Sequence, residues 1–204
     1  MRELEHLRRR FGSHEPGLLG ARHRYAVLCP LVEKPDGLHL LFEVRAAGLR
    51  QGGEVCFPGG RAEPGESPVD CALRETVEEL NIPSSAVTVL GTPDFICNQR
   101  GFLLHPVLGL VSPAGLGAMR PSPAEVAEVF TVPFSFFQAT EPEVYTYDLI
   151  PQGPEGFPYE ELGIARDYPW SRGRVEVPVW RYENRVIWGM TARIVWELVI
   201  LISD

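Results

Sequence analysis

The segment GRAEPGESPVDCALRETVEELNI, from Gly60 to Ile82, predicts a glycine turn that leads into a short helix rich in glutamate. Ser67 suits the N-cap of this helix, and Pro68 suits its first position, where the missing N–H costs nothing. The helix is expected to run to about Leu80, because Asn81 tolerates the left-handed conformation that ends helices.

A rotation of about 100° per residue separates the side chains of this helix into two faces. The expected apolar face comprises Val69, Leu73, Thr76, Val77 and Leu80. Glu75, Glu78 and Glu79 are expected to share the opposite face, although like charges at this spacing destabilise a helix by ~0.2–0.5 kcal/mol per pair. A solvated acidic face is the common explanation of such a cluster. The alternative is a hard divalent cation, Mg²⁺ or Mn²⁺, which prefers oxygen ligands.

The turn before this helix supports the cation site. Phe57-Pro58-Gly59-Gly60 ends a glycine-rich stretch, and closely spaced glycines let the backbone approach a ligand or metal, although a simple tight turn also uses them. A backbone carbonyl at Gly59 or Gly60 is expected to complete the oxygen shell of the cation.

The spacing of the charged residues resembles the Nudix box, which is glycine, five residues, glutamate, seven residues and then Arg-Glu-aliphatic-x-Glu-Glu-x-Gly-aliphatic. The matching positions are Gly60, Glu66, Arg74, Glu75, Glu78, Glu79 and Ile82. Thr76 stands where an aliphatic residue is usual and Asn81 replaces the last glycine, and neither change removes a charged group. So many fixed positions favour membership over chance agreement.

The Nudix resemblance implies a single α/β domain over residues 1–204, an α/β/α sandwich with a mixed β-sheet. The helix of the box covers one face of this sheet and a C-terminal helix covers the other. It also implies a metal-dependent hydrolase acting on phosphoanhydrides.

The same resemblance implies a role for each charged residue of the box. Glu75 and Glu79 would bind the metal directly, and Glu78 would be a ligand or would hold metal-bound water. Arg74 would orient one of these carboxylates, and Glu66 would pair with Arg74 or assist the metal shell.

The general base of this superfamily often comes from outside the box. Glu125 is the expected base and Glu128 the second choice. Because both alternate with apolar residues, the polar edge of a strand or helix is the competing interpretation.

A second resemblance narrows the substrate. The segment LFEVR at residues 41–45, Arg50, and GEVCFPGG at residues 53–60 are similar to the upstream signature of the coenzyme A (CoA) pyrophosphatase subfamily. The segments IWGMTA at 187–192 and PAEVAEVFTV at 123–132 are similar as well. Phe42 and Glu43 depart from that signature, which has Leu and Thr there, and Arg50 precedes Gly53 by three residues where four are expected.

The subfamily resemblance implies cleavage of CoA or acyl-CoA into 3′,5′-ADP and 4′-phosphopantetheine or its acyl form. One alternative is a Nudix hydrolase of ADP-ribose, NADH, a dinucleoside polyphosphate or a damaged nucleotide. Another is a Nudix-fold binding module without catalysis, which would not need the acidic cluster.

Arginines and aromatic residues are the candidates for substrate binding, since a bidentate arginine suits a phosphate and an aromatic ring can stack on adenine. The candidates are Arg45, Arg50, Arg61, Arg100, Phe57, Phe95 and Phe102, together with the backbone of Gly59. Surface ion pairs for the arginines and core packing for the aromatics compete with these roles.

Composition excludes several classes of protein. A formal charge of −8 argues against general nucleic-acid binding, and no segment reaches the ~20 consecutive apolar residues of a membrane span. The basic start lacks the apolar run of a signal peptide, so a cytoplasmic protein is expected. Its cysteines are scattered and are expected to be reduced thiols: Cys29, Cys56, Cys71 and Cys97.

The remaining elements are predicted from residue patterns. Strands are predicted at 25–32, 38–44, 54–57, 87–90, 103–111 and 181–187, helices at 1–12 and 133–137, and loops at 12–20 and 94–101. Residues 145–178 are expected to form an extended, partly β, loop-rich insertion. The helix at 189–202 is expected to be buried against the sheet or against a second subunit, which leaves a homodimer open.

Overall fold

A long hairpin forms the centre of the main sheet. The computed structural model describes residues 2–14, 17–20, 23–98 and 101–203, and in it β1 (His23–Lys34) pairs with β2 (Gly37–Arg45). Lys34 lies opposite Gly37, so a short turn at Pro35 and Asp36 joins the two strands. The centre of β1, residues 28–32, is buried on both sides of the sheet, which explains its nearly continuous apolar sequence.

The main sheet is mixed, as expected, with the order β3-β2-β1-β7-β5. β4 also pairs with β1, β6 with β7 and β8 with β2. β1 and β7 are parallel, and the other pairs are antiparallel. The further strands are β3 (Val55–Cys56), β4 (Gly59–Arg61), β5 (Val87–Gly91), β6 (Ile96–Asn98), β7 (Phe102–Val111) and β8 (Val126–Pro133).

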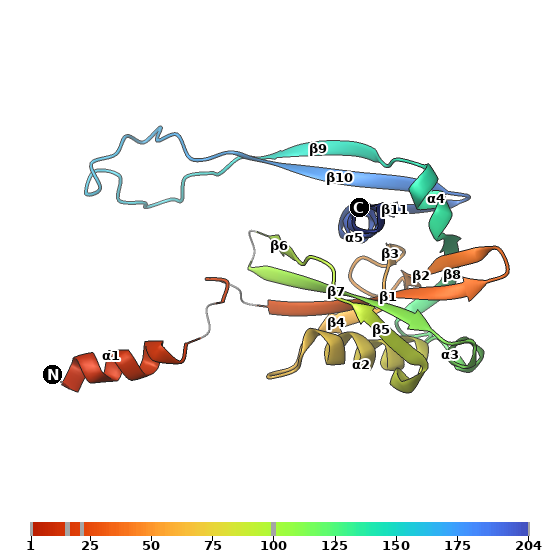
Figure 1. The fold of residues 1–204 in the computed structure, drawn as a ribbon. Helices are drawn as coiled ribbons and strands as arrows, with labels where there is room; N and C mark the ends of the chain where they lie inside the picture. Colours follow the sequence, from red (N-terminus) through yellow and green to blue (C-terminus); the bar gives the residue numbers. More distant parts are fainter. Residues whose placement is uncertain (1, 15–16, 21–22, 99–100, 204) are drawn as a thin grey trace.

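The helix of the box, α2 (Pro68–Leu80), covers one face of this sheet, with α3 (Pro113–Ala118) on the same side (Figure 1). A short 3-10 helix, η1 (Ser84–Ala86), links α2 to β5. Ala72 and Leu80 pack with Leu28, Leu41 and Val107 of the strands. This buried layer fixes the position of α2 against β1 and β4.

The opposite face carries a second layer. The C-terminal helix α5 (Gly189–Ser203) lies between the main sheet and a three-stranded sheet (Figure 1). That sheet is formed by β9 (Glu143–Leu149), β10 (Gly173–Tyr182) and β11 (Arg185–Trp188), and α4 (Phe134–Ala139) leads into it. Phe42 of the main sheet shares one apolar core with Trp180 and Leu198. The sandwich expected from the sequence is therefore confirmed, with an additional β-layer outside α5.

Several predicted elements need correction. The last strand, predicted at 181–187, is a hairpin of β10 and β11 whose turn contains Glu183 in the left-handed region. The predicted loop 94–101 contains β6, and the strand predicted at 54–57 is the two-residue β3, after which β4 begins at Gly59. The expectation that residues 145–178 are partly β agrees with the structure, since β9 pairs with β10 from Glu143↔Val179 to Leu149↔Gly173. These corrections concern which strands pair and where a turn divides them, which local residue patterns do not report.

The N-terminal helix α1 (Arg2–Gly12) forms as predicted, and none of its residues is buried. Leu4, Leu7 and Phe11 lie on its surface, between 50% and 68% exposed. The amphipathic pattern therefore predicted the helix correctly, and the apolar residues do not contact the core.

Candidate active site

The ends of α2 are set by the residues that the sequence indicated. The Ser67 hydroxyl accepts a hydrogen bond from the Asp70 N–H at 3.1 Å, and Pro68 begins the helix. Asn81 adopts φ 55° and ψ 30°, and its N–H donates to the Val77 carbonyl at 2.9 Å. These caps hold the helix in register with the glycine turn that precedes it.

The buried face of α2 is rotated from the predicted one. Val77, expected in the core, is 39% exposed, whereas Ala72 and Cys71 are buried. Glu79, expected on the open acidic face, is 5% exposed and points at the glycine turn. The reason is a hydrogen bond, because the Gly59 N–H donates to Glu79 Oε2 at 2.7 Å and holds that carboxylate against β4.

The two glycines of β4 allow this approach. A Cβ atom at Gly59 would lie 2.3 Å from the Ala26 carbonyl oxygen, and one at Gly60 would lie 2.3 Å from the Glu75 carboxyl carbon. Neither position can hold a larger residue without displacing its neighbour. The Gly60 carbonyl, the expected cation ligand, accepts a weak hydrogen bond from the Cys71 thiol at 3.6 Å, and Gly60 is paired with Ala26 of β1 in the sheet.

Arg74 joins three carboxylates of the box. Its Nε donates to Glu66 at 2.9 Å, and its terminal nitrogens reach Glu75 at 2.7 Å and Glu78 at 3.2 Å. A further nitrogen donates to the Arg61 carbonyl at 3.1 Å. Through these bonds the arginine holds the pKa of the Glu66 carboxyl at about 2, well below its usual value. Glu66 is therefore paired with Arg74, one of the two placements expected from the sequence.

Burial removes solvent from the carboxylates of this site, and their protein partners do not fully offset that loss. Burial raises the pKa of Glu79 to about 8, with the charge of Glu43 as the second cause, and it raises the pKa of Glu75 as well. Glu43 on β2 was not among the sequence candidates, yet it is 1% exposed and its pKa rises to about 7, chiefly through burial. A glutamate inside the otherwise apolar run LLFEV, residues 40–44, was the available signal.

The two candidates for the base have different surroundings. Glu125 is exposed beside the start of β8, and its charge acts on Glu43, Glu75 and Glu79. Glu128 forms an ion pair with Arg185. Glu125 therefore lies near the acidic cluster, whereas Glu128 is paired with Arg185.

A cavity of about 560 Å³ opens beside the glycine turn, on the α5 side of the sheet. Arg45, Phe57, Gly59 and Gly60 line it, as do Phe102 and Arg193. The Phe57 ring is buried and stacks on Phe42 at 4.8 Å, which is a core contact.

The other substrate candidates are more scattered. Arg50 and Arg61 are exposed and contribute their carbonyls, which accept hydrogen bonds from Arg45 and Arg74. Phe102 stacks on Tyr25 at 4.5 Å. Arg100 lies outside the described residues.

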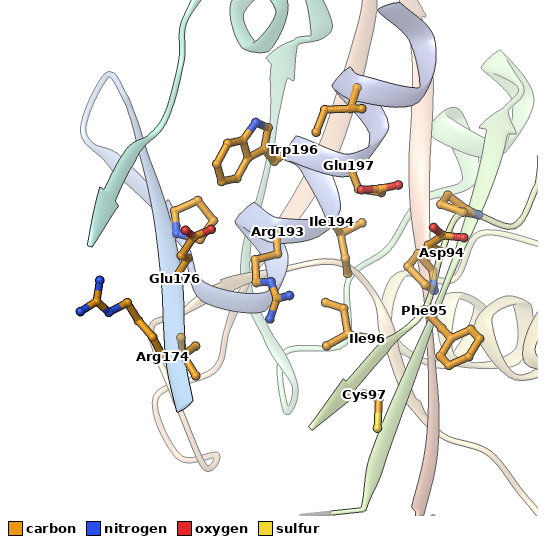
Figure 2. Close-up of a pocket in the computed structure, with 15 residues that line it drawn as sticks. Asp94, Phe95, Ile96, Cys97, Arg174, Glu176, Arg193, Ile194, Trp196 and Glu197 are labelled. Carbon is orange, nitrogen blue, oxygen red and sulfur yellow. The ribbon is translucent and has the colours of Figure 1, made fainter. Parts of the chain in front are cut away.

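A second cavity, of about 660 Å³, adjoins the first, and Figure 2 shows its walls. Ile96, Val175 and Arg193 line both cavities. In Figure 2 the Arg193 side chain leaves α5 and points between β10 and the strand that carries Ile96. Phe95, which lies in this second cavity, is 55% exposed and contacts the His105 ring.

The donor set fits a hard divalent cation. Within the described ranges no three His, Cys, Asp or Glu side chains are already arranged to hold a metal ion. The carboxylates of Glu43, Glu75 and Glu79 are nevertheless gathered with insufficient positive charge, and one buried oxygen of Glu43 has no hydrogen-bond partner. Oxygen donors with excess negative charge suit Mg²⁺ or Mn²⁺.

The remaining expectations concern cysteines and membranes. Cys29, Cys56, Cys71 and Cys97 are free thiols. Among the described helices none is long and apolar enough to cross a membrane.

Comparison with known proteins identifies the family. The family model for the NUDIX domain matches residues 22–149. A protein described as Nudix hydrolase NudL from Photorhabdus laumondii is 37% identical over 186 residues, covering 90% of this chain and 87% of the relative. Its namesake from Yersinia enterocolitica is 36% identical over 192 residues, covering 90% and 84%.

Among solved structures, a MutT/nudix family protein from Enterococcus faecalis superimposes with a TM-score of 0.50 at 15% identity, covering 98% of this chain and 70% of that one. This likeness concerns the fold alone. The matched domain and the two relatives extend over most of the chain, including the box at 60–82. The chain therefore belongs to the Nudix hydrolase family.

Proposed function

We propose that this Nudix hydrolase cleaves the pyrophosphate bond of CoA or acyl-CoA, releasing 3′,5′-ADP and 4′-phosphopantetheine or its acyl form. The observation that carries the proposal is the position of the segment that resembles the CoA pyrophosphatase signature. Through Arg45, Phe57, Gly59 and Gly60 this segment forms a wall of the cavity beside the box carboxylates. A substrate in that cavity would contact the signature directly and would reach the acidic cluster at the glycine turn, where the Gly59 N–H binds Glu79.

Glu75 and Glu79, with Glu78 and the Gly60 carbonyl, would hold Mg²⁺ or Mn²⁺. When bound, such a cation neutralises phosphate oxygens, polarises phosphorus and lowers the pKa of water. The chain prepares this arrangement in two ways, because Arg74 fixes the carboxylates of Glu75 and Glu78 and the Gly59 N–H fixes that of Glu79. Hydrogen bonds of this kind hold a ligand in its working orientation.

Glu125 would accept the proton of the attacking water. Glu125 is exposed to solvent, and its charge acts on the box carboxylates. A water that attacks the phosphoanhydride has to be activated beside these carboxylates. The water oxygen would then bond to phosphorus while the bridging oxygen leaves with the other phosphate. Most of the rate in such reactions comes from positioning and charge stabilisation.

Among the arginines proposed from the sequence, Arg45 is the best placed to contact the substrate phosphates. It lines the cavity, and its Nε makes only a long hydrogen bond of 3.4 Å to the Arg50 carbonyl. Arg50 and Arg61 are exposed at the surface, so any contact with substrate would be made from the rim.

The proposal is tested by product analysis on the purified protein. CoA, acetyl-CoA, ADP-ribose, NADH and a dinucleoside polyphosphate are incubated separately with Mg²⁺ or Mn²⁺, and products are separated by chromatography. Faster cleavage of CoA or acetyl-CoA than of the others supports the proposal. Cleavage of another substrate alone would refute the CoA assignment, and inactivity on all five would favour a non-catalytic binding module.

A homodimer remains part of the proposal. Ile200, Leu201 and Ile202 at the end of α5 are 46%, 50% and 53% exposed, although most of the helix is packed in the core. Light scattering on the purified protein would test this, since a monomer has a mass of 22.8 kDa. A mass near that value at all concentrations would rule the dimer out.

A further inference from the structure

Glu43 occupies an unusual position for a carboxylate. It lies in the middle of β2, opposite Cys56 of β3 on one side and Val129 of β8 on the other. Side chains alternate along a strand, so Glu43 shares a face with Leu41, which packs in the core layer beneath α2. Glu43 therefore points to the side of the sheet that carries the box helix.

The carboxylate of Glu43 is incompletely satisfied. Its Oε1 accepts a hydrogen bond from the Cys56 thiol at 3.4 Å, and a thiol is a weak donor. Its Oε2 is buried and has no hydrogen-bond partner among the described residues. Because Glu43 as a whole is only 1% exposed, solvent does not compensate for this. Buried charged oxygens in proteins are normally paired, hydrogen-bonded or bound to a metal.

The surroundings of Glu43 indicate what the missing partner is. The charges of Glu43 and Glu125 both act on Glu79, and the charge of Glu125 acts on Glu43. Arg45 is the positive group that acts on Glu43, and its hydrogen bond goes to the Arg50 carbonyl instead. Negative charge exceeds positive charge around Oε2, so a cation fits the position better than a further acceptor.

We propose that Glu43 is an additional carboxylate of the cation site, its Oε2 atom supplying an oxygen donor to the divalent cation. This inference rests on the proposed function, which assigns the cation to Glu75 and Glu79. It adds a residue from the central strand β2, outside the box, and it explains why a buried oxygen in that strand is left without a protein partner. Glu43 would thereby add a ligand from the sheet to the cation site on α2.

The test is a titration of the full-length protein with Mn²⁺ alone, with free Mn²⁺ measured by electron paramagnetic resonance. Glu43→Gln keeps the size and the acceptor for Cys56 but removes the charge. We expect it to weaken Mn²⁺ binding by about 10–100-fold. Glu33→Gln is the matched control, because Glu33 also lies on a strand but is exposed and is not part of the proposed cation site. It should bind Mn²⁺ as the wild type does.

Glu43→Thr is a second variant in case the glutamine variant does not fold, since threonine is favoured in strands and also lacks a carboxylate. Thermal melting provides a second readout. Without metal at pH 8, Glu43→Gln should melt at or above the wild-type temperature, because a buried charge is gone. Added Mn²⁺ should raise the melting temperature of the wild type more than that of either variant.

Mn²⁺ binding within twofold of the wild type in both Glu43 variants would overturn the inference, as would equal weakening in Glu33→Gln. These outcomes are separate from the fate of the proposed function, because no substrate is present. If Mn²⁺ binding depends on Glu43 but CoA is not cleaved, the inference stands and the substrate assignment fails. If CoA is cleaved and Mn²⁺ binding is independent of Glu43, the substrate assignment stands and the inference about Glu43 fails.

Discussion

Gly60→Ala perturbs the candidate site through a single methyl group. The added Cβ would lie 2.3 Å from the carboxyl carbon and from Oε1 of Glu75 and 2.5 Å from its Oε2. Carbon atoms in contact are separated by ~3.5–4.0 Å, so the Glu75 carboxylate has to move by more than about 1 Å. The displaced group is the far end of a side chain, and the backbone therefore stays in place.

The expected effect is a loss of activity without a comparable loss of stability. A displacement of about 1 Å in a catalytic arrangement costs roughly 100-fold in rate, or about 2.7 kcal/mol of transition-state stabilisation. The free energy of unfolding should change by only about 1 kcal/mol, since replacing glycine by alanine in a permitted conformation has effects of that size.

The assay measures kcat/KM for CoA together with urea denaturation of the same variant. Gly91→Ala is the matched control, because a Cβ at Gly91 of β5 meets nothing within 4 Å. Gly59→Ala is the opposite case, since its Cβ would meet backbone atoms of Ala26 and Val27 at 2.3 and 2.6 Å and should destabilise the fold itself. A Gly60→Ala variant with kcat/KM within threefold of the wild type would refute the reasoning.

Three further predictions follow from the charged groups of the site. Arg74→Lys loses the planar group that reaches several carboxylates, so kcat should fall about 10–100-fold in steady-state kinetics, and an unchanged kcat would contradict this. Glu125→Gln should lower kcat by about 10²–10⁴-fold. Glu128→Gln should leave kcat within about twofold, because Glu128 is paired with Arg185. Equal losses of kcat in the two variants would contradict the role of Glu125 as the base. In metal-free buffer the melting temperature should fall as pH rises from about 5 to 8. Burial raises the pKa of Glu43 to about 7 and of Glu79 to about 8, both above the ordinary 4.5, so the folded state loses stability as these carboxyls ionise. A rise in melting temperature over that range would contradict the assignment.

The local signals in the sequence were sufficient for α2 and its turn. Caps at Ser67 and Asn81 act within a few residues of the chain, so their chemistry is visible in the sequence. The contacts of Arg74 with the box carboxylates follow from the same short range, because they join residues that lie on one helix or in the turn before it.

Long-range contacts account for what the sequence did not reveal. Glu79 is buried because a backbone N–H of β4 points at it, and helical periodicity alone places it on the open face with Glu78. Glu43 lies beneath α2 only through the order of the sheet, which brings β2 to that position. Glu128 is paired with Arg185, 57 positions later in the chain, and no local pattern indicates that contact.

The most direct test of the account compares wild-type protein with Glu79→Gln in the release of 3′,5′-ADP from CoA with saturating Mg²⁺. The account predicts that the wild type cleaves CoA and that the variant is slower by about 100-fold or more while keeping its fold, because a proposed cation ligand is lost. Release of 3′,5′-ADP by Glu79→Gln at the wild-type rate would contradict the proposed cation site at the box helix.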